Sequence, residues 1–450
     1  MLYSTTTVPV RRPAPFLLHR ELHHRLDILA RAHRVPGAQL VLDTGSEVVS
    51  VHTGTADAAT GAPFTADTAV PLGSLTKSYT AALVLLLAED GDLDPDDPVA
   101  DYLPELRESG RVTIRQLLSH TGGLPTGVDS DAAAMTTAAH YLSAVSTARY
   151  ALFPPGSDFS YSNAGYVAAG RLVETVTGMP WHEAVHALLL EPLGTVPAFL
   201  GKSGPARPVA AGHALNTATG RVRPVRQNLA PLEAPAGALL ASAADLHALG
   251  RALVDRSEAL PPVVAAAMRR PEAAARPGAL ADGWGLGVAL YRQDDQLWCG
   301  HDGNAQGTSC HLRADPDSGL VVAFTGNAGA ATALWRDLAE ALERTSGVRI
   351  PAVVAPAEPG DPVALPECAG TYANGGLRYH VALEPDGSPT LSVDGDLPIP
   401  LLCYPDLSCD LVDPGTGRRE PGGRFHRDPA TGGIDRMQIS GRTARRIVAA

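Results

Sequence analysis

A serine and a lysine stand three residues apart where a long apolar segment begins, in "PLGSLTKSYTAALVLLL" at residues 71–87. On a helix, side chains at this spacing are neighbours on one face, so Ser74 and Lys77 would lie within hydrogen-bonding reach. A serine hydroxyl becomes a nucleophile when a base takes its proton. A lysine amine can be that base when burial lowers its pKa, and the surrounding leucines and alanines predict burial. The pair therefore predicts a nucleophile and its general base.

The use of lysine at this position supports that interpretation. The chain has two lysines, Lys77 and Lys202, whereas Lys and Arg together number 36. Arginine stays protonated in proteins, so it cannot serve as the base. The alternative is a chance S-x-x-K match with a surface lysine, but a surface lysine is an unusual residue to open an apolar run.

A second motif lies in "FSYSNAGY", where Tyr161 and Asn163 stand at a predicted loop-to-helix junction. A tyrosine near two basic groups can act as a phenolate or as a proton relay. Asn163 can donate an amide hydrogen bond to Lys77 and to a substrate carbonyl. The alternative is a structural role, because the Tyr-x-Asn pattern is common.

A third motif, "CGHDGNAQG", places His301, Gly303 and Asn304 at the end of a predicted strand. We expect His301 to help hold positive potential near the other two motifs, and Gly303 to let the backbone approach a substrate. The backbone N–H groups of Ser74 and Asn304 together predict an oxyanion hole. The alternative for His301 is a turn histidine that binds nothing.

The elements that must position these motifs follow from the apolar periodicity. Leucines at helical spacing predict a helix over about 16–34, followed by two strands, "AQLVLDTG" and "EVVSVHTG". The region from about 95 to 235 is predicted to be mostly helix and loop. After residue 283 four short strand patterns alternate with turns, and a helix follows them. This order predicts a sheet backed by terminal helices, with an all-helical lobe inserted.

The C-terminal part of the chain has a different character. Residues 347–366 carry five prolines and predict a stiff, extended linker. Residues 367–450 contain short alternating strands that predict a small antiparallel barrel or sandwich. Residues 1–346 are therefore predicted to form the catalytic domain, and 367–450 a second domain.

The three motifs, in this order along the chain, resemble those of the penicillin-binding-protein and class C β-lactamase superfamily of active-site serine enzymes. Supporting stretches include "LLSHTGGLP" and "PPGSDFSYSNAGY", and the resemblance covers roughly residues 20–346. It implies an α+β, β-lactamase/transpeptidase-like fold, with an antiparallel sheet flanked by helices. It also implies that Ser74 is acylated, that Lys77 and Tyr161 share the base and acid roles, that Asn163 positions both, and that His301 occupies the third motif.

One residue departs from the pattern of most β-lactamases, whose third motif begins with lysine instead of histidine. Histidine at the place of His301 is usual in the esterase and D-aminopeptidase branches of the superfamily. Antibiotic hydrolysis is therefore not the expected native activity. The "HTGGL" segment is interpreted as packing around the inserted lobe, so His120 receives no catalytic role.

A catalytic domain of this kind followed by a lipocalin-like barrel resembles D-aminopeptidases, some esterases and the stand-alone penicillin-binding-protein-type thioesterases. The last group releases and macrocyclises nonribosomal peptides. That resemblance implies a peptidyl substrate presented by a carrier protein, attack by the peptide's own amine, and a D-configured residue on Ser74. The alternatives are a D-stereospecific aminopeptidase, amidase or esterase with the same serine chemistry, and a non-catalytic receptor that is only acylated.

Three arginines of the last predicted strand, Arg442, Arg445 and Arg446, are candidates for substrate binding. Their forked donors suit a substrate carboxylate, and the strand end would reach over the cleft. The alternative is an exposed basic strand end.

Composition excludes several classes of function. The net charge of −12 argues against nucleic-acid binding, because no basic stripe is present to neutralise phosphates. The sequence contains no stretch of about 18 apolar residues, so no membrane-spanning helix is predicted. The five cysteines have no CxxC spacing, so free thiols are expected, without a metal or another cofactor. The N-terminus lacks the pattern of a signal peptide, which predicts a cytoplasmic protein.

Overall fold

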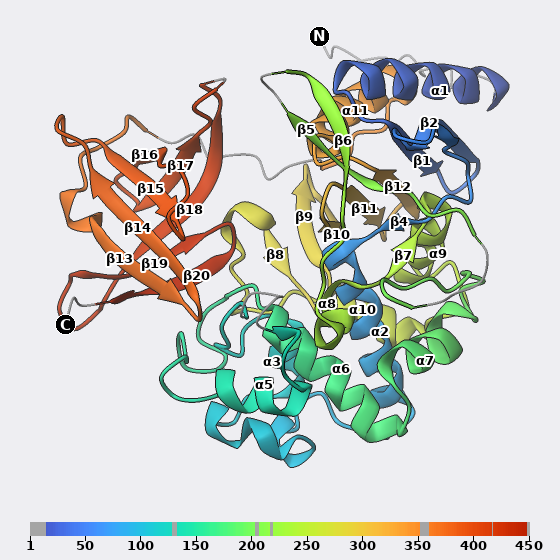
Figure 1. The fold of residues 1–450 in the computed structure, drawn as a ribbon. Helices are drawn as coiled ribbons and strands as arrows, with labels where there is room; N and C mark the ends of the chain where they lie inside the picture. The colour runs from blue at the N-terminus through green and yellow to red at the C-terminus, as the bar shows by residue number, and fades with distance from the viewer. Residues whose placement is uncertain are drawn as a thin grey trace, which may run out of the picture.

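An eight-stranded antiparallel sheet forms the centre of the first domain (Figure 1). The computed structural model describes residues 15–127, 133–202, 207–216, 219–351, 360–415 and 417–447. In spatial order the strands of the sheet are β3 (Ala62–Pro63), β2 (Val48–Asp57), β1 (Gly37–Asp43), β12 (Leu320–Gly326), β11 (Ser309–Asp315), β10 (Gln296–Gly303), β9 (Ala289–Gln293) and β8 (Gly283–Trp284). The predicted early strand pair and the four later strands are therefore confirmed as parts of one sheet.

Each face of this sheet supports its own apolar core. Successive strand side chains point to opposite faces, so both faces of a fully buried strand such as β1 must be covered. Leu40 packs in the core under α1 (Pro15–Ala32) and α11 (Ala331–Ser346), whereas the next residue, Val41, packs in the core that contains α9 (Ala243–Leu253). The predicted N-terminal helix over 16–34 is thus confirmed, and it lies beside α11 along the top of Figure 1.

The helical lobe lies on the α9 side of the sheet and packs around α2 (Thr76–Glu89), which is buried on nearly all sides. Its other helices are α3 (Ile114–Leu118), α5 (Ala138–Val145), α6 (Asn163–Thr177), α7 (Trp181–Val185), α8 (Ala234–Gly237) and α10 (Pro262–Arg269). Short helical turns lie at Gly73–Leu75 (η1), Val99–Asp101 (η2), Pro104–Ser109 (η3), His186–Leu190 (η4), Pro231–Glu233 (η5) and Gly278–Leu280 (η6). Two short strands, β4 (Val70–Pro71) and β7 (Leu240–Ala241), pair just before η1.

A β-hairpin interrupts the region that was predicted to be helix and loop. Strands β5 (Gly212–Asn216) and β6 (Arg221–Val225) pair with each other and extend up beside the sheet (Figure 1). The hairpin is held from outside the lobe, because Arg34 at the end of the first helix donates a hydrogen bond to Gly220 O at 2.7 Å. Long-range contacts of this kind are not visible in local sequence patterns.

The C-terminal domain is a closed antiparallel barrel of eight strands. These are β13 (Gly370–Asn374), β14 (Leu377–Leu383), β15 (Pro389–Val393), β16 (Ile399–Cys403), β17 (Ser408–Val412), β18 (Arg419–Arg427), β19 (Ile434–Ile439) and β20 (Arg442–Ile447), preceded by the turn η7 (Pro366–Cys368). Pairing of β20 with β13 closes the barrel, and closure removes the unpaired sheet edges. The predicted barrel is confirmed, although its strands β13, β16 and β17 were not predicted.

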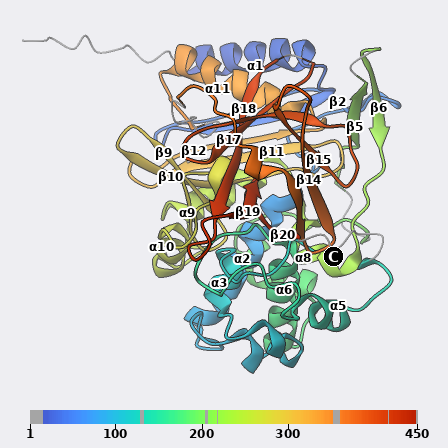
Figure 2. The ribbon, with the colours of Figure 1, turned by 90° about the vertical axis from the view of Figure 1, so that its left-hand side faces the viewer.

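The barrel stands beside the catalytic domain, on the side where β8 and β9 lie (Figure 1), and Figure 2 shows it in front of the sheet. Residues 352–359 of the predicted linker lie outside the described part of the chain. All five cysteines are buried free thiols. Within the described ranges, no helix has both the length and the apolar surface that a membrane crossing needs.

Candidate active site

The first motif lies where the turn η1 joins helix α2, and it brings Ser74 and Lys77 together. Nζ of Lys77 donates hydrogen bonds to Oγ of Ser74 at 3.1 Å and to the backbone carbonyl of Ala236 at 2.9 Å. The lysine side chain is 1% exposed, as the apolar helix predicted. Ala236 belongs to α8, which packs between α2 and α6. The amine is therefore held beside the hydroxyl by elements far apart in sequence.

Burial gives this lysine the property that a general base needs. Desolvation lowers the pKa of Lys77 from 10.5 to about 7, and the positive charge of Arg442 acts in the same direction. The carboxylate of Glu233 partly opposes both effects. A group with a pKa near 7 is present in comparable protonated and neutral forms at neutral pH, and the neutral amine can accept the Ser74 proton.

Tyr161 of the second motif lies over the same amine. Its ring centroid is 5.0 Å from Nζ of Lys77, and its hydroxyl is buried. Burial raises the pKa of Tyr161 well above its usual value, although its interaction with the Ser74 hydroxyl and the charge of Arg442 both oppose this. The resting side chain is therefore a neutral phenol, which favours the proton-relay role over the phenolate role.

Asn163 is the first residue of α6, and it lines the cavity at Ser74. Its backbone N–H donates to Thr126 O at 2.9 Å, and its Oδ1 is buried without a partner in the described residues. The expected hydrogen bond from Asn163 to Lys77 is not present among these residues. Lys77 donates instead to Ala236 O on α8. The free amide is available to a substrate.

His301 of the third motif is neutral, so the expectation that it holds positive potential is wrong. Burial and the charge of Lys77 together lower the pKa of His301 to about 4. Its Nδ1–H donates to Asp302 O at 2.5 Å, because a carbonyl can only accept. The remaining nitrogen, Nε2, is buried without a partner in the described residues, and the ring packs 5.3 Å from that of Trp284 and 6.2 Å from that of Tyr161.

The glycine of this motif serves close packing within the protein. A Cβ on Gly303 would lie 2.0 Å from Leu72 O, so only glycine lets β10 approach the turn that carries Ser74. We expected Gly303 to let the backbone come close to a substrate. In the structure Gly303 instead lets β10 come close to the backbone of Leu72. Gly73, on the turn, is needed for the same contact. A Cβ added to Gly73 would lie 2.1 Å from Asn304 O, and the φ of Gly73 is +53°. The two segments are in contact.

Ser74 and Asn304 line one cavity of about 350 Å³, which also includes Lys77, Asn163 and Glu233. The oxyanion hole formed by their backbone N–H groups stays a prediction, which requires both groups to point into this cavity.

The three predicted arginines separate along β20. The guanidinium of Arg442 lies 5.3 Å from the Tyr161 ring centroid, so this residue reaches the site. Arg445 and Arg446 bond elsewhere, and their part in substrate binding stays a prediction. Arg445 donates to Ala151 O at 3.0 Å, and Arg446 donates to backbone carbonyls of the barrel itself. Four residues of strand place Arg446 roughly 13 Å beyond Arg442, away from the cleft.

Sequence reasoning missed two contributors to the site and undervalued a third. Glu233 and the Ala236 carbonyl come from "PLEAPAGALL", which carries no motif that points to Lys77. His120 was assigned to packing, and it is buried with φ +60°. Its Nδ1 accepts the backbone N–H of Ser162 at 3.1 Å, and its ring lies 4.3 Å from that of Tyr161. The packing role of His120 thus supports the second motif directly.

The barrel also holds the second motif in place. The backbone N–H of Tyr161 donates to Gly441 O at 2.9 Å, and Oγ1 of Thr443 donates to Phe159 O at 2.8 Å. Nδ2 of Asn374 contacts Ser160 Oγ at 3.3 Å. The loop before α6 therefore bonds to strands of the second domain, and the two domains build one site.

This geometry agrees with comparisons to known proteins. A family model described as Beta-lactamase matches residues 21–344. The chain belongs to the Beta-lactamase family. Penicillin-binding protein 4 of Amycolatopsis lactamdurans is 34% identical over 380 residues, which cover 80% of this chain and 98% of that protein. Esterase EstB of Burkholderia gladioli is 30% identical over 326 residues, covering 62% and 82%.

Solved structures extend the likeness of this Beta-lactamase family protein to the barrel. The crystal structure of SurE superposes with a TM-score of 0.83 at 37% identity, covering 96% of this chain and 100% of that one. A D-stereospecific amidohydrolase from Streptomyces sp. superposes with a TM-score of 0.58 at 26% identity, covering 75% and 100%. The chain is therefore a serine enzyme of the Beta-lactamase family, a hydrolase or an acyltransferase.

Proposed function

We propose that this protein is an acyltransferase that releases a peptide from a carrier-bound thioester and closes it into a ring. The observation that carries the proposal is the 3.1 Å contact between Nζ of Lys77 and Oγ of Ser74, with the pKa of the lysine lowered to about 7. Likeness to SurE over both domains supports a shared overall task, and the resemblance of the domain arrangement to that of peptide-cyclising thioesterases supports cyclisation.

In the first half-reaction the neutral amine of Lys77 accepts the Ser74 proton while Oγ attacks the thioester carbonyl. The carbonyl oxygen becomes negative and is bound by the N–H groups of Ser74 and Asn304. The C–S bond then breaks, the thiol leaves with a proton passed on by Lys77 and Tyr161, and the peptidyl group remains as an ester on Ser74.

In the second half-reaction the peptide's own amine attacks that ester. Lys77 or Tyr161 takes a proton from the amine, the new amide bond forms, and the bond to Oγ breaks. Ser74 recovers its proton, and the ring leaves. Cyclisation requires that the amine be held near the ester and that water be kept from it.

The acylating residue is proposed to be D-configured. SurE has been crystallised with D-Leu, and a D-stereospecific amidohydrolase shares the fold. Both facts support a D residue next to the carbonyl that Ser74 attacks.

A hydrolase is the second candidate function. The D-amino acid amidase from Ochrobactrum anthropi superposes with a TM-score of 0.61 at 26% identity, and EstB is named an esterase. The same Ser74 chemistry with water as acceptor would give a free acid. A receptor that is only acylated is the third candidate.

The deciding experiment incubates the protein with a peptidyl thioester whose last residue is D-configured, and weighs the products. A product lighter than the free acid by one water supports cyclisation. Free acid alone contradicts the cyclase and supports the hydrolase, and an acyl-protein that does not turn over supports the receptor.

The role of Lys77 is tested with two substitutions of the same residue. We expect Lys77→Met and Lys77→Arg both to lower the acylation rate by about 10²–10⁴-fold, because neither side chain can accept the Ser74 proton. The Lys77→Arg variant keeps the positive charge, so it separates loss of the base from loss of charge. Acylation at the wild-type rate in either variant would contradict the assigned base.

A further inference from the structure

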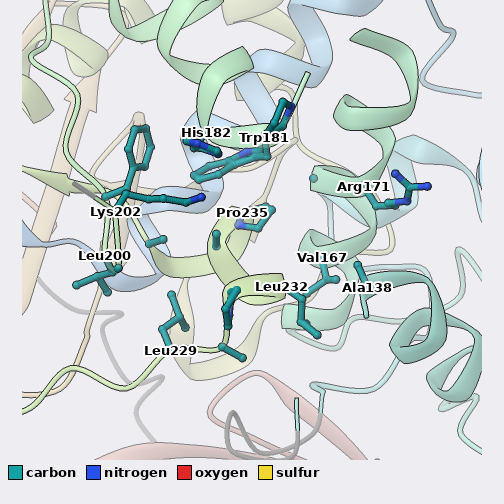
Figure 3. A pocket seen from close by; sticks show the side chains of 18 of the residues that line it. Ala138, Val167, Arg171, Trp181, His182, Leu200, Lys202, Leu229, Leu232 and Pro235 are labelled. Carbon is teal, nitrogen blue, oxygen red and sulfur yellow. The ribbon is translucent and has the colours of Figure 1, made fainter. Parts of the chain in front are cut away.

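A second cavity adjoins the Ser74 cavity and has no part in the chemistry above. It has a volume of about 880 Å³, against about 350 Å³ for the cavity at Ser74. Sites for small organic ligands typically measure about 300–1,000 Å³. The cavity lies between α6, α7 and the segment that leads into α8 (Figure 3).

The two cavities share a wall. Leu200, Asn228 and Leu229 line both of them. Pro235 of α8 lines the large cavity, and the next residue, Ala236, lines the Ser74 cavity and bonds to Lys77. The two cavities therefore adjoin each other next to Ser74.

One part of the wall of the large cavity is apolar, and the rest is polar or charged. Trp181 and Phe199 meet edge to face with ring centroids 5.7 Å apart, and Val167, Leu229 and Leu232 complete the apolar surface. The indole N–H of Trp181 donates to the Thr80 hydroxyl at 3.1 Å. Because this polar atom is already bonded, the tryptophan ring offers only its apolar surface to a ligand.

Unpaired positive charge stands at the same cavity. Lys202, the second of the two lysines, extends across the cavity below Trp181 and toward Pro235 (Figure 3). Arg226 also lines it. Neither side chain forms an ion pair with a carboxylate of the described residues.

The other charged lining groups largely cancel. Arg171 lies 3.7 Å from a carboxylate oxygen of Glu105 and 3.7 Å from one of Glu174, and it points away from the cavity in Figure 3. In a chain with a net charge of −12, two cations that pair with no carboxylate of the described residues lie beside a partly apolar cavity. They suit a ligand with an apolar body and an anionic group.

We infer that this cavity binds a part of the thioester substrate away from the reacting carbonyl, with bulky apolar groups against Trp181 and Phe199 and an anionic group on Lys202 and Arg226. This inference rests on the proposed function. The anion has two possible sources with the same chemistry. One is a carboxylate side chain of the peptide, and the other is the phosphate of a phosphopantetheine arm.

The test compares kcat/KM for three thioesters of one apolar peptide with a D-configured last residue. The first is a neutral peptide on N-acetylcysteamine, the second has an acidic residue on the same thiol, and the third is the neutral peptide on phosphopantetheine. We expect one anionic substrate to exceed the neutral one by about tenfold, which corresponds to about 1.4 kcal/mol. Preference for the second substrate identifies a carboxylate, and preference for the third identifies a phosphate.

The double variant Lys202→Met/Arg226→Gln should lose this preference. The variant Lys202→Glu should reverse it, so that the neutral substrate reacts faster than the anionic one. Arg223→Gln is the matched control, because Arg223 is exposed on β6, three residues before Arg226, and does not line the cavity. Equal kcat/KM for all three substrates in the wild-type protein would overturn the inference, and so would an anion preference that survives in the double variant.

A separate substitution tests the contact of the substrate with the apolar part of the wall. Phe199→Ala should raise KM about tenfold for peptides with a bulky apolar residue, and should change KM little for the same peptide with alanine there. An equal effect on both peptides would overturn the assignment of this wall. Labelling of wild-type Ser74 by a small fluorophosphonate tests the proposed function separately. Labelling without any anion preference contradicts only this inference, whereas failure to label contradicts the proposed function.

Discussion

At the scale of single residues, the site depends on the balance of charge around one amine. Lys77 has no carboxylate hydrogen-bonded to it in the described residues, and its two bonds go to a hydroxyl and a carbonyl. Neutral partners do not stabilise the ammonium form as a carboxylate would. Desolvation therefore dominates, and it lowers the pKa of Lys77 to about 7.

The pH dependence of the reaction follows from this value. The neutral amine is the reactive form, so activity should rise as the pH increases through about 7. In Arg442→Gln, a positive charge that lowers the pKa of Lys77 is lost. That pKa should then rise, and the acidic limb of the kcat/KM profile should move to higher pH.

Arg445→Gln is the control for this substitution, because Arg445 bonds to Ala151 O and does not act on Lys77. A profile of Arg442→Gln that keeps its acidic limb and shows only a raised KM at every pH would instead identify Arg442 as a substrate-binding residue. The two roles are thus separated by one set of pH-rate profiles.

At the scale of secondary-structure elements, the close contact of β10 with η1 is the feature that places the motifs. We expect Gly303→Ala to lower both activity and stability, because the new Cβ would lie 2.0 Å from Leu72 O and would push the Ser74 turn away from the strand. Overpacking of this kind typically costs about 1–3 kcal/mol. Denaturant unfolding and the rate of Ser74 acylation measure the two effects.

Gly329→Ala is the matched control, since a Cβ at Gly329 meets no atom within 4 Å and its φ is not in the left-handed region. A Gly303→Ala protein with wild-type stability and acylation rate would show that the strand and the turn are not in tight contact.

A buried polar network fixes β10 on its other side. Asp302 accepts hydrogen bonds from Arg313 at 2.6 and 3.1 Å and contacts His311 Nδ1 at 2.8 Å. His311 Nε2 contacts Ser309 Oγ at 2.9 Å, which gives the connectivity of a Ser–His–Asp triad. Ser309 is fully buried and also bonded to Thr332, so the network serves structure instead of catalysis.

At the scale of the whole molecule, the barrel is part of the active site. Asn374 is fully buried at the junction and accepts a hydrogen bond from the Thr126 N–H at 2.6 Å, while its Nδ2 donates to Thr443 O at 2.8 Å. We expect Asn374→Ala to lower the free energy of unfolding by about 1–3 kcal/mol, because it leaves buried backbone groups without partners. It should also slow Ser74 acylation about tenfold, since Thr126 bonds to the second motif.

Thr431→Ala, on an exposed turn of the barrel, is the control for that prediction. Calorimetry and acylation kinetics on the full-length protein provide the measurements. A variant that loses stability but acylates at the wild-type rate would mean that the barrel is attached to the catalytic domain without organising its site.

Much of this molecule could be predicted from its sequence because the signals are local. Ser74 and Lys77 are one helical turn apart, so their contact follows from helix geometry alone. The apolar run of α2 predicted that the lysine is buried, and short strand patterns predicted most strands of both domains. The sequence by itself therefore determined the contact between Ser74 and Lys77 and most of the order of the elements.

The tertiary structure alone decided the features that depend on residues distant in sequence. The neutral state of His301 comes from burial beside Lys77, which no pattern near residue 301 reveals. Selection of Arg442 over Arg445 and Arg446 depends on where β20 meets the catalytic domain. The large cavity is assembled from α6, α7 and the segment before α8. The desolvation, charge and shape of a site depend on all the residues that surround it in space. Local sequence patterns do not show which distant residues those are.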